Sequence, residues 1–120
     1  MDKKEDDENI FKMGFDVCFK RIQAQVHQNA VAHGWGDESR EDGTLIALIM
    51  SEAAEALEAL RKGNGPDEHC PQFSGAEVEL ADVVIRIMDM AEARGWNVAG
   101  AIVAKHEFNQ TRPYKHGKEF

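Results

Sequence analysis

Two pairs of acids within residues 44–90 constrain the fold of this chain more than any other feature of its sequence. The first pair is Glu52 and Glu55, and the second is Glu79 and Asp82; each lies in a run with the apolar spacing of a helix. Residues three apart share one face of a helix, with Cβ atoms about 5–6 Å apart. Two such helices packed antiparallel can therefore bring all four carboxylates together.

Four carboxylates that face one another need a counter-charge. Two unit charges 4 Å apart repel by about 4 kcal/mol at an effective dielectric constant of 20, and burial of each carboxylate adds a further cost. The residues around the acids are mostly apolar, so the two helices have little polar surface on which the acids could point into water. These neighbours are Leu48, Ile49, Ala53, Ala56, Val78, Ala81, Val83 and Ile85. An all-oxygen cluster suits a hard cation, so the sequence predicts a site for Mg²⁺, with Mn²⁺ as a possible substitute.

The alternative is that these acids form ordinary salt bridges with Arg61, Lys62 or Arg86. For a single acid on a helix that alternative is the commoner outcome, but two matched pairs on apolar helices favour the metal site. Arg86 follows Asp82 by one helical turn, and Asp89 lies on the same stripe. Arg86 is predicted to pair with one of these two aspartates, either to orient metal ligands or as a purely structural pair.

Apolar spacing and end signals predict an all-α, four-helix protein with no strand. Residues 1–8 are expected to form a frayed acidic leader. Asp42 or Thr44 is a candidate N-cap for the second helix, Ser74 begins a capping-box pattern at the third, and Asn97 can cap the fourth. The predicted helices span about residues 9–33, 44–62, 74–94 and 98–110.

Charge and composition exclude several classes of protein. The chain has 120 residues, enough for one domain, and no apolar run approaches the roughly 20 residues that span a bilayer. Its start is charged and does not resemble a signal peptide, so a cytoplasmic protein without membrane attachment is expected. The net charge of −8 argues against binding of a nucleic-acid polymer. Residues 105–120 are nevertheless net +2, which suits a small polyanion.

The third predicted helix is apolar nearly all round, and the second is nearly so. A helix without a polar face must be covered on every side. Four helices in one 120-residue chain cannot easily cover two such helices. A homodimer or higher oligomer is therefore predicted.

Three segments of the chain are similar to the motifs of a known family. They are Ser-Glu-Ala-Ala-Glu at residues 51–55, Glu-Leu-Ala-Asp at 79–82 and Asn-Gln-Thr-Arg-Pro-Tyr-Lys-His-Gly at 109–117. They resemble the MazG-like branch of the all-α nucleoside triphosphate pyrophosphohydrolases, over roughly residues 20–120. The resemblance implies one MazG-like domain over residues 1–120, a four-helix bundle that assembles as a homodimer or homotetramer.

The resemblance also implies an activity: Mg²⁺-dependent cleavage of a (d)NTP between its α- and β-phosphates, which gives the monophosphate and pyrophosphate. By motif match, Glu52, Glu55, Glu79 and Asp82 would be the metal ligands. A water activated by the metal would attack, with Glu55 as first and Glu52 as second candidate for the base that takes its proton. The loops before and after the second helix do not match the base-contacting segments of dCTP- or dUTP-specific members, so the base is not implied.

Residues outside the acid pairs are candidates for substrate contacts. Lys105, Asn109, Arg112 and Lys115 recur at steps of four, three and three, and with the motif match they are predicted to bind phosphate oxygens. The alternative for them is a solvated basic terminus. Trp35 lies between two glycines and is a candidate platform for a base, or else a cap on the core.

The remaining aromatic and imidazole side chains are assigned structural roles: Trp96 to the core, and His27 and His33 to the first helix as ordinary helix histidines. Two other functions stay open from the sequence. One is a non-catalytic helical dimer that binds metal or nucleotide as a sensor or partner protein, and the other is a purely structural bundle with surface-paired acids.

Overall fold

The computed structural model describes residues 2–35 and 40–119. Within these ranges the protein is all-helical, with α1 (Lys3–Ala32), α2 (Asp42–Arg61), α3 (Gly75–Arg94), α4 (Val98–Gln110) and a short 3₁₀ helix, η1 (Tyr114–Gly117), and it contains no strand. The prediction of an all-α, four-helix chain is confirmed. None of the described helices has the length and apolar character needed to cross a membrane.

Helix α1 begins earlier than the sequence suggested. The Asp2 carboxylate accepts a hydrogen bond from the Lys4 amide at 3.0 Å and caps the helix. Glu5 and Asp6 in the first turn interact favourably with the positive end of the helix dipole. Residues 3–8 are therefore helical, and the prediction of a frayed leader over these residues is wrong.

The start of α2 differs from both predicted caps. The N-cap position is Glu41, which makes no side-chain cap, and Asp42 is already the first helical residue. The Asp42 carboxylate instead accepts a hydrogen bond from Arg94 Nε of α3 at 2.7 Å. A contact between two helices, rather than a local cap, therefore holds this end of α2.

The predicted ends of α3 and α4 are confirmed. Ser74 Oγ accepts from the Glu77 amide, and the Glu77 carboxylate accepts from the Ser74 amide, which completes the capping box. Gly95 ends α3 in the left-handed conformation with φ +70°, and the Asn97 side chain caps α4 by accepting from the Gly100 amide. Local signals in the sequence thus determine both ends of α3.

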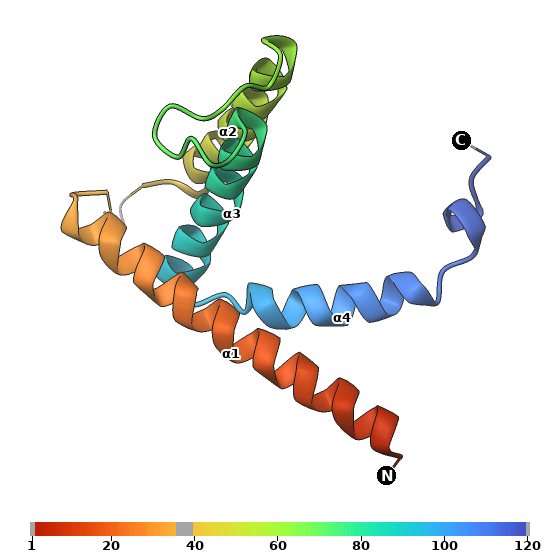
Figure 1. Cartoon of the computed structure of the whole chain (residues 1–120). Helices are drawn as coiled ribbons and strands as arrows, with labels where there is room; N and C mark the ends of the chain where they lie inside the picture. The colour runs from red at the N-terminus through yellow and green to blue at the C-terminus, as the bar shows by residue number, and fades with distance from the viewer. Residues whose placement is uncertain (1, 36–39, 120) are drawn as a thin grey trace.

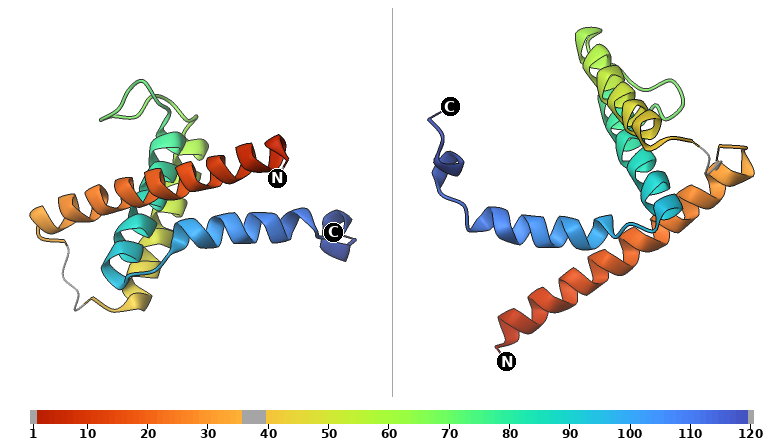
Figure 2. Two further views of the ribbon diagram at one scale, coloured as in Figure 1. Left: turned by 90° about the horizontal axis from the view of Figure 1, so that it is seen from below. Right: turned by 180° about the vertical axis from the view of Figure 1, so that it is seen from behind.

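Helices α2 and α3 run antiparallel as a closely packed pair, and α1 crosses the lower half of α3 (Figures 1 and 2). Gly75 permits the close approach of the pair, because a Cβ atom there would lie 3.2 Å from Ala59 Cβ of α2. The connecting loop is closed at its base: the Gly75 amide donates to Gly65 O at 2.9 Å, and the Ala76 amide donates to Asn64 Oδ1 at 2.8 Å. This packing sets the register of α2 against α3.

Helix α4 extends away from α2 and α3 and packs mainly on α1, where Glu107 forms an ion pair with Lys12 (Figure 1). The single chain is therefore an open arrangement, and the closed four-helix bundle that the sequence suggested is not formed within it. Trp96, between α3 and α4, is 48% exposed rather than part of the core.

The protein exposes much more surface than a compact monomer of its mass. Its accessible surface is 9056 Å², whereas a compact 13.4 kDa chain exposes about 6,500 Å². Its radius of gyration is 17.4 Å, against about 13.6 Å for a compact domain of this length. Among the described residues, those that are buried and apolar are mostly small or flexible: Leu45, Ala56, Ala76, Met88, Met90, Ala91 and Ala99.

Candidate metal and substrate site

Three of the four predicted acids come together between α2 and α3. Glu52 of α2 and Glu79 and Asp82 of α3 each offer one carboxylate oxygen, and these oxygens lie within 4.8 Å of one another. The antiparallel packing of the two helices places Glu52 opposite the second turn of α3. Glu55 is exposed and lies outside this group, although its charge acts on Glu79. The group of Glu52, Glu79 and Asp82 is called the acid cluster below.

The acid cluster is electrostatically strained. Burial raises the pKa of Glu79 above its usual value, and a hydrogen bond with Glu52 and the charges of Glu52, Asp82 and Glu55 raise it further. Burial also raises the pKa of Asp82, and the charge of Glu52 adds to this effect while the Arg86 guanidinium opposes it. The cluster therefore favours a bound proton or cation over three free carboxylates.

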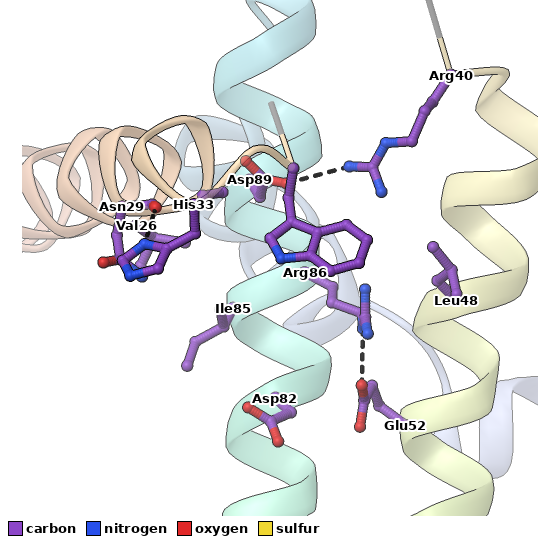
Figure 3. Close-up of a pocket in the computed structure, with 12 residues that line it drawn as sticks. Val26, Asn29, His33, Arg40, Leu48, Glu52, Asp82, Ile85, Arg86 and Asp89 are labelled. Carbon is purple, nitrogen blue, oxygen red and sulfur yellow. Dashed lines mark hydrogen bonds and ion pairs between the residues drawn. The ribbon is translucent and has the colours of Figure 1, made fainter. Parts of the chain in front are cut away.

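Arg86 pairs with Glu52 of α2, and not with either aspartate of its own helical stripe. Its Nε donates to Glu52 Oε1 at 2.8 Å, where Asp82 or Asp89 was the predicted partner (Figure 3). Asp89 instead interacts with His27 Nδ1 at 2.8 Å and lies 3.7 Å from Arg40. The salt-bridge alternative is thus realised for Glu52, and Arg86 offsets only part of the charge of the cluster.

A pocket of about 690 Å³ extends from Glu52 and Asp82 to the first helix and the loop before α2 (Figure 3). This volume is in the range of small-molecule sites. Trp35, the predicted base platform, lines it and is 66% exposed. The complete lining among the described residues is Val26, Asn29, Ala30, His33, Trp35, Arg40, Leu48, Glu52, Asp82, Ile85, Arg86 and Asp89. Carboxylates, two guanidinium groups and an indole thus line the same pocket.

Several pocket residues were not identified from the sequence. His33 lines the pocket, and His27 forms a hydrogen bond of 2.8 Å with Asp89 of its lining. Arg40 also lines it, and the Arg40 Nε atom is buried with no hydrogen-bond partner among the described residues. No periodic pattern could have identified Arg40, because it lies in the connection between two helices.

The basic tail does not reach this pocket within one chain. Lys105 and Asn109 lie on α4 beside a separate shallow hollow, and the Lys105 ammonium lies 4.6 Å from the centre of the Phe108 ring. The Arg112 guanidinium lies 5.7 Å from the same ring, and Lys115 lies over Tyr114. The structure therefore separates these four predicted phosphate-binding residues from the acid cluster, and their role stays a prediction.

Comparisons with protein-family models, with curated proteins and with solved structures find no match to this chain. The similarity to MazG-like proteins therefore rests on the three short motifs alone.

Proposed function

We propose that the protein is a nucleoside triphosphate pyrophosphohydrolase, which hydrolyses a (d)NTP to the monophosphate and pyrophosphate. The observation that carries the proposal is that two members of the acid cluster, Glu52 and Asp82, line a pocket of about 690 Å³ that is also lined by Trp35 and two arginines. A triphosphate near the carboxylates and a base against the indole would match these lining groups in chemical character. The motif resemblance supports the same assignment.

The acid cluster fits a divalent cation. Oxygen ligands about 2.1 Å from one Mg²⁺ lie roughly 3–4 Å from each other in an octahedron, and the three oxygens here are within 4.8 Å. The raised pKa values of Glu79 and Asp82 indicate that positive charge is favoured at this position. When bound, Mg²⁺ or Mn²⁺ would neutralise phosphate oxygens and make a water molecule more acidic.

Glu55 is the better candidate for the carboxylate that takes the proton from the attacking water. It follows Glu52 by one turn of α2, it is exposed, and it lies near enough to the acid cluster for its charge to act on Glu79. Glu52 already accepts a hydrogen bond from Arg86, so one of its oxygens is engaged. Glu52, Glu79 and Asp82 would hold the ion while Glu55 stays available.

We also propose that the working form is a homodimer or homotetramer. The chain exposes about 2,500 Å² more than a compact monomer of its mass, an excess of the size that stable homodimers bury. Exposed apolar side chains lie on every helix, including Phe11 of α1, Leu60 of α2, Leu80 of α3 and Phe108 of α4. An assembly would cover these side chains and would let the basic tail of one chain approach the pocket of another.

The test is incubation of the protein and Mg²⁺ with each common (d)NTP, with separate detection of pyrophosphate and inorganic phosphate. Pyrophosphate release is expected, together with a loss of at least about 100-fold in kcat/KM for Glu55→Gln. Glu58→Gln is the matched control, because Glu58 is on the same helix and pairs only with Lys62 among the described residues, at 3.6 Å.

Light scattering coupled to size exclusion would report the assembly, and circular dichroism would confirm that each variant is folded. Stabilisation by Mg²⁺ or nucleotide without release of pyrophosphate would refute the enzyme and leave a non-catalytic nucleotide-binding protein.

A further inference from the structure

A triphosphate bound in the pocket needs positively charged partners, and the acid cluster supplies none. A triphosphate carries about four negative charges near neutral pH, and the described lining includes three carboxylates, from Glu52, Asp82 and Asp89. The lining side chains that are always cationic are Arg40 and Arg86. Arg40 lies beside Asp89. Arg86 contacts Glu52 of the acid cluster and is therefore the cation best placed for a phosphate next to the cluster.

The geometry of Arg86 leaves most of its donors available. A guanidinium has five N–H groups in a planar fork, and Arg86 uses its Nε to hold Glu52 Oε1 at 2.8 Å. Among the described residues none accepts a hydrogen bond from the terminal nitrogens, and the side chain is 38% exposed. Figure 3 shows the guanidinium beside the Glu52 carboxylate, among the side chains that line the pocket. The terminal N–H groups can thus reach a ligand while Nε remains on Glu52.

We propose that Arg86 is a substrate-binding residue whose terminal nitrogens bind a phosphate of the triphosphate while its Nε holds Glu52 in position. This inference rests on the proposed function, because it names the residue that receives the phosphate chain at the same site. One side chain would thereby link the phosphate chain to a metal-binding carboxylate. Lysine cannot do this, since its single ammonium lacks the fork that serves two partners in fixed directions.

A purely structural role for Arg86 makes a different prediction. If Arg86 only neutralises Glu52, its replacement should change the affinity for Mg²⁺ and the stability of the protein, but not the affinity for phosphate. If it binds phosphate, its replacement should weaken phosphate binding more than Mg²⁺ binding. The two affinities can be measured separately.

The experiment is isothermal titration of the full chain with Mg²⁺ alone, and then with inorganic tripolyphosphate in saturating Mg²⁺. Loss of charge-assisted hydrogen bonds in Arg86→Gln is expected to weaken tripolyphosphate binding by about 10- to 100-fold. Arg86→Lys should fall between the wild type and Arg86→Gln. The control is Lys62→Gln, which also removes the cation of an ion pair, that to Glu58 at 3.6 Å, but does so outside the pocket.

Kinetics distinguish this inference from the proposed function. If the protein releases pyrophosphate and Arg86→Gln leaves KM unchanged, Arg86 is not a phosphate ligand although the enzyme assignment stands. If no (d)NTP is hydrolysed but Arg86→Gln abolishes tripolyphosphate binding, the phosphate ligand stands and the enzyme assignment falls. Equal weakening of Mg²⁺ and tripolyphosphate binding, or no tripolyphosphate binding by the wild type, would overturn the inference. If Arg86→Gln does not fold, Arg86→Lys decides between these outcomes.

Discussion

Replacement of Glu79 by Gln should stabilise the metal-free protein and remove most of its stabilisation by Mg²⁺. The glutamine keeps the size of the side chain and can donate its amide N–H to Glu52, so the interaction with Glu52 that raises the pKa of Glu79 is replaced rather than lost. What disappears is one negative charge from the acid cluster. The substitution thus measures the charge repulsion within the acid cluster without a change in side-chain packing.

The size of the effect follows from the distances in the cluster. Two charges 4.8 Å apart repel by about 0.9 kcal/mol in water and about 3.5 kcal/mol at an effective dielectric constant of 20. Glu79 faces two such charges and is only partly buried, so the lower value applies to each. Glu79→Gln should therefore add about 1–2 kcal/mol to the free energy of unfolding without metal. Mg²⁺ at a hundredfold excess over its Kd should stabilise the wild type by about 2.7 kcal/mol.

The assay is thermal unfolding of both proteins at one protein concentration, in EDTA and in Mg²⁺. In EDTA the variant should melt about 4–8 °C above the wild type, and in saturating Mg²⁺ the order should reverse or the difference should vanish. Glu58→Gln is the control and should change the free energy of unfolding by less than about 0.5 kcal/mol in either buffer. A variant that is less stable than wild type in EDTA, and equally stabilised by Mg²⁺, would refute the reasoning.

Three further predictions concern pH, the end of α3 and the pocket. Because the pKa values of Glu79 and Asp82 are raised above their ordinary 4.5 and 3.8, the folded state binds these protons more tightly than the unfolded chain. Stability in EDTA should therefore fall as pH rises above this range, and urea unfolding with and without Mg²⁺ should show the loss only without metal. Gly95→Ala should lower the free energy of unfolding by about 1–2 kcal/mol in urea, since φ is +70° there and no atom obstructs a Cβ. Trp35→Ala should weaken nucleotide binding by about 1–3 kcal/mol in titration calorimetry and leave tripolyphosphate binding unchanged.

Elements of the fold whose ends are set by local chemistry could be predicted from the sequence. Ser74 with Glu77, Gly95 and Asn97 each act within four residues, and the ends of α3 and α4 match the prediction. The start of α2 could not be predicted in this way, because Asp42 interacts with Arg94 from another helix. The path of α4 is equally nonlocal, since it depends on packing against α1.

In the candidate site too, features set within one helix could be predicted from the sequence, and features set by contacts between helices could not. Helical periodicity placed Glu79 and Asp82 on one face, and the apolar surroundings predicted that they would meet Glu52. The exclusion of Glu55 from the cluster depends on the register between α2 and α3, which Gly75 and Ala59 determine by their close contact. Arg40 enters the pocket from the connection between α1 and α2, and no repeat in the sequence marks such a position.

The loop between α2 and α3 is a position where extra residues can be inserted. Its base is closed through Asn64, Gly65 and Gly75, whereas Pro71 and Gln72 near its tip are exposed. Extra residues inserted between Pro71 and Gln72 add only a small, slowly growing closure entropy, roughly 0.6 kcal/mol for each doubling of loop length. A peptide tag or small domain can therefore be placed in this loop while the two helices keep their alignment.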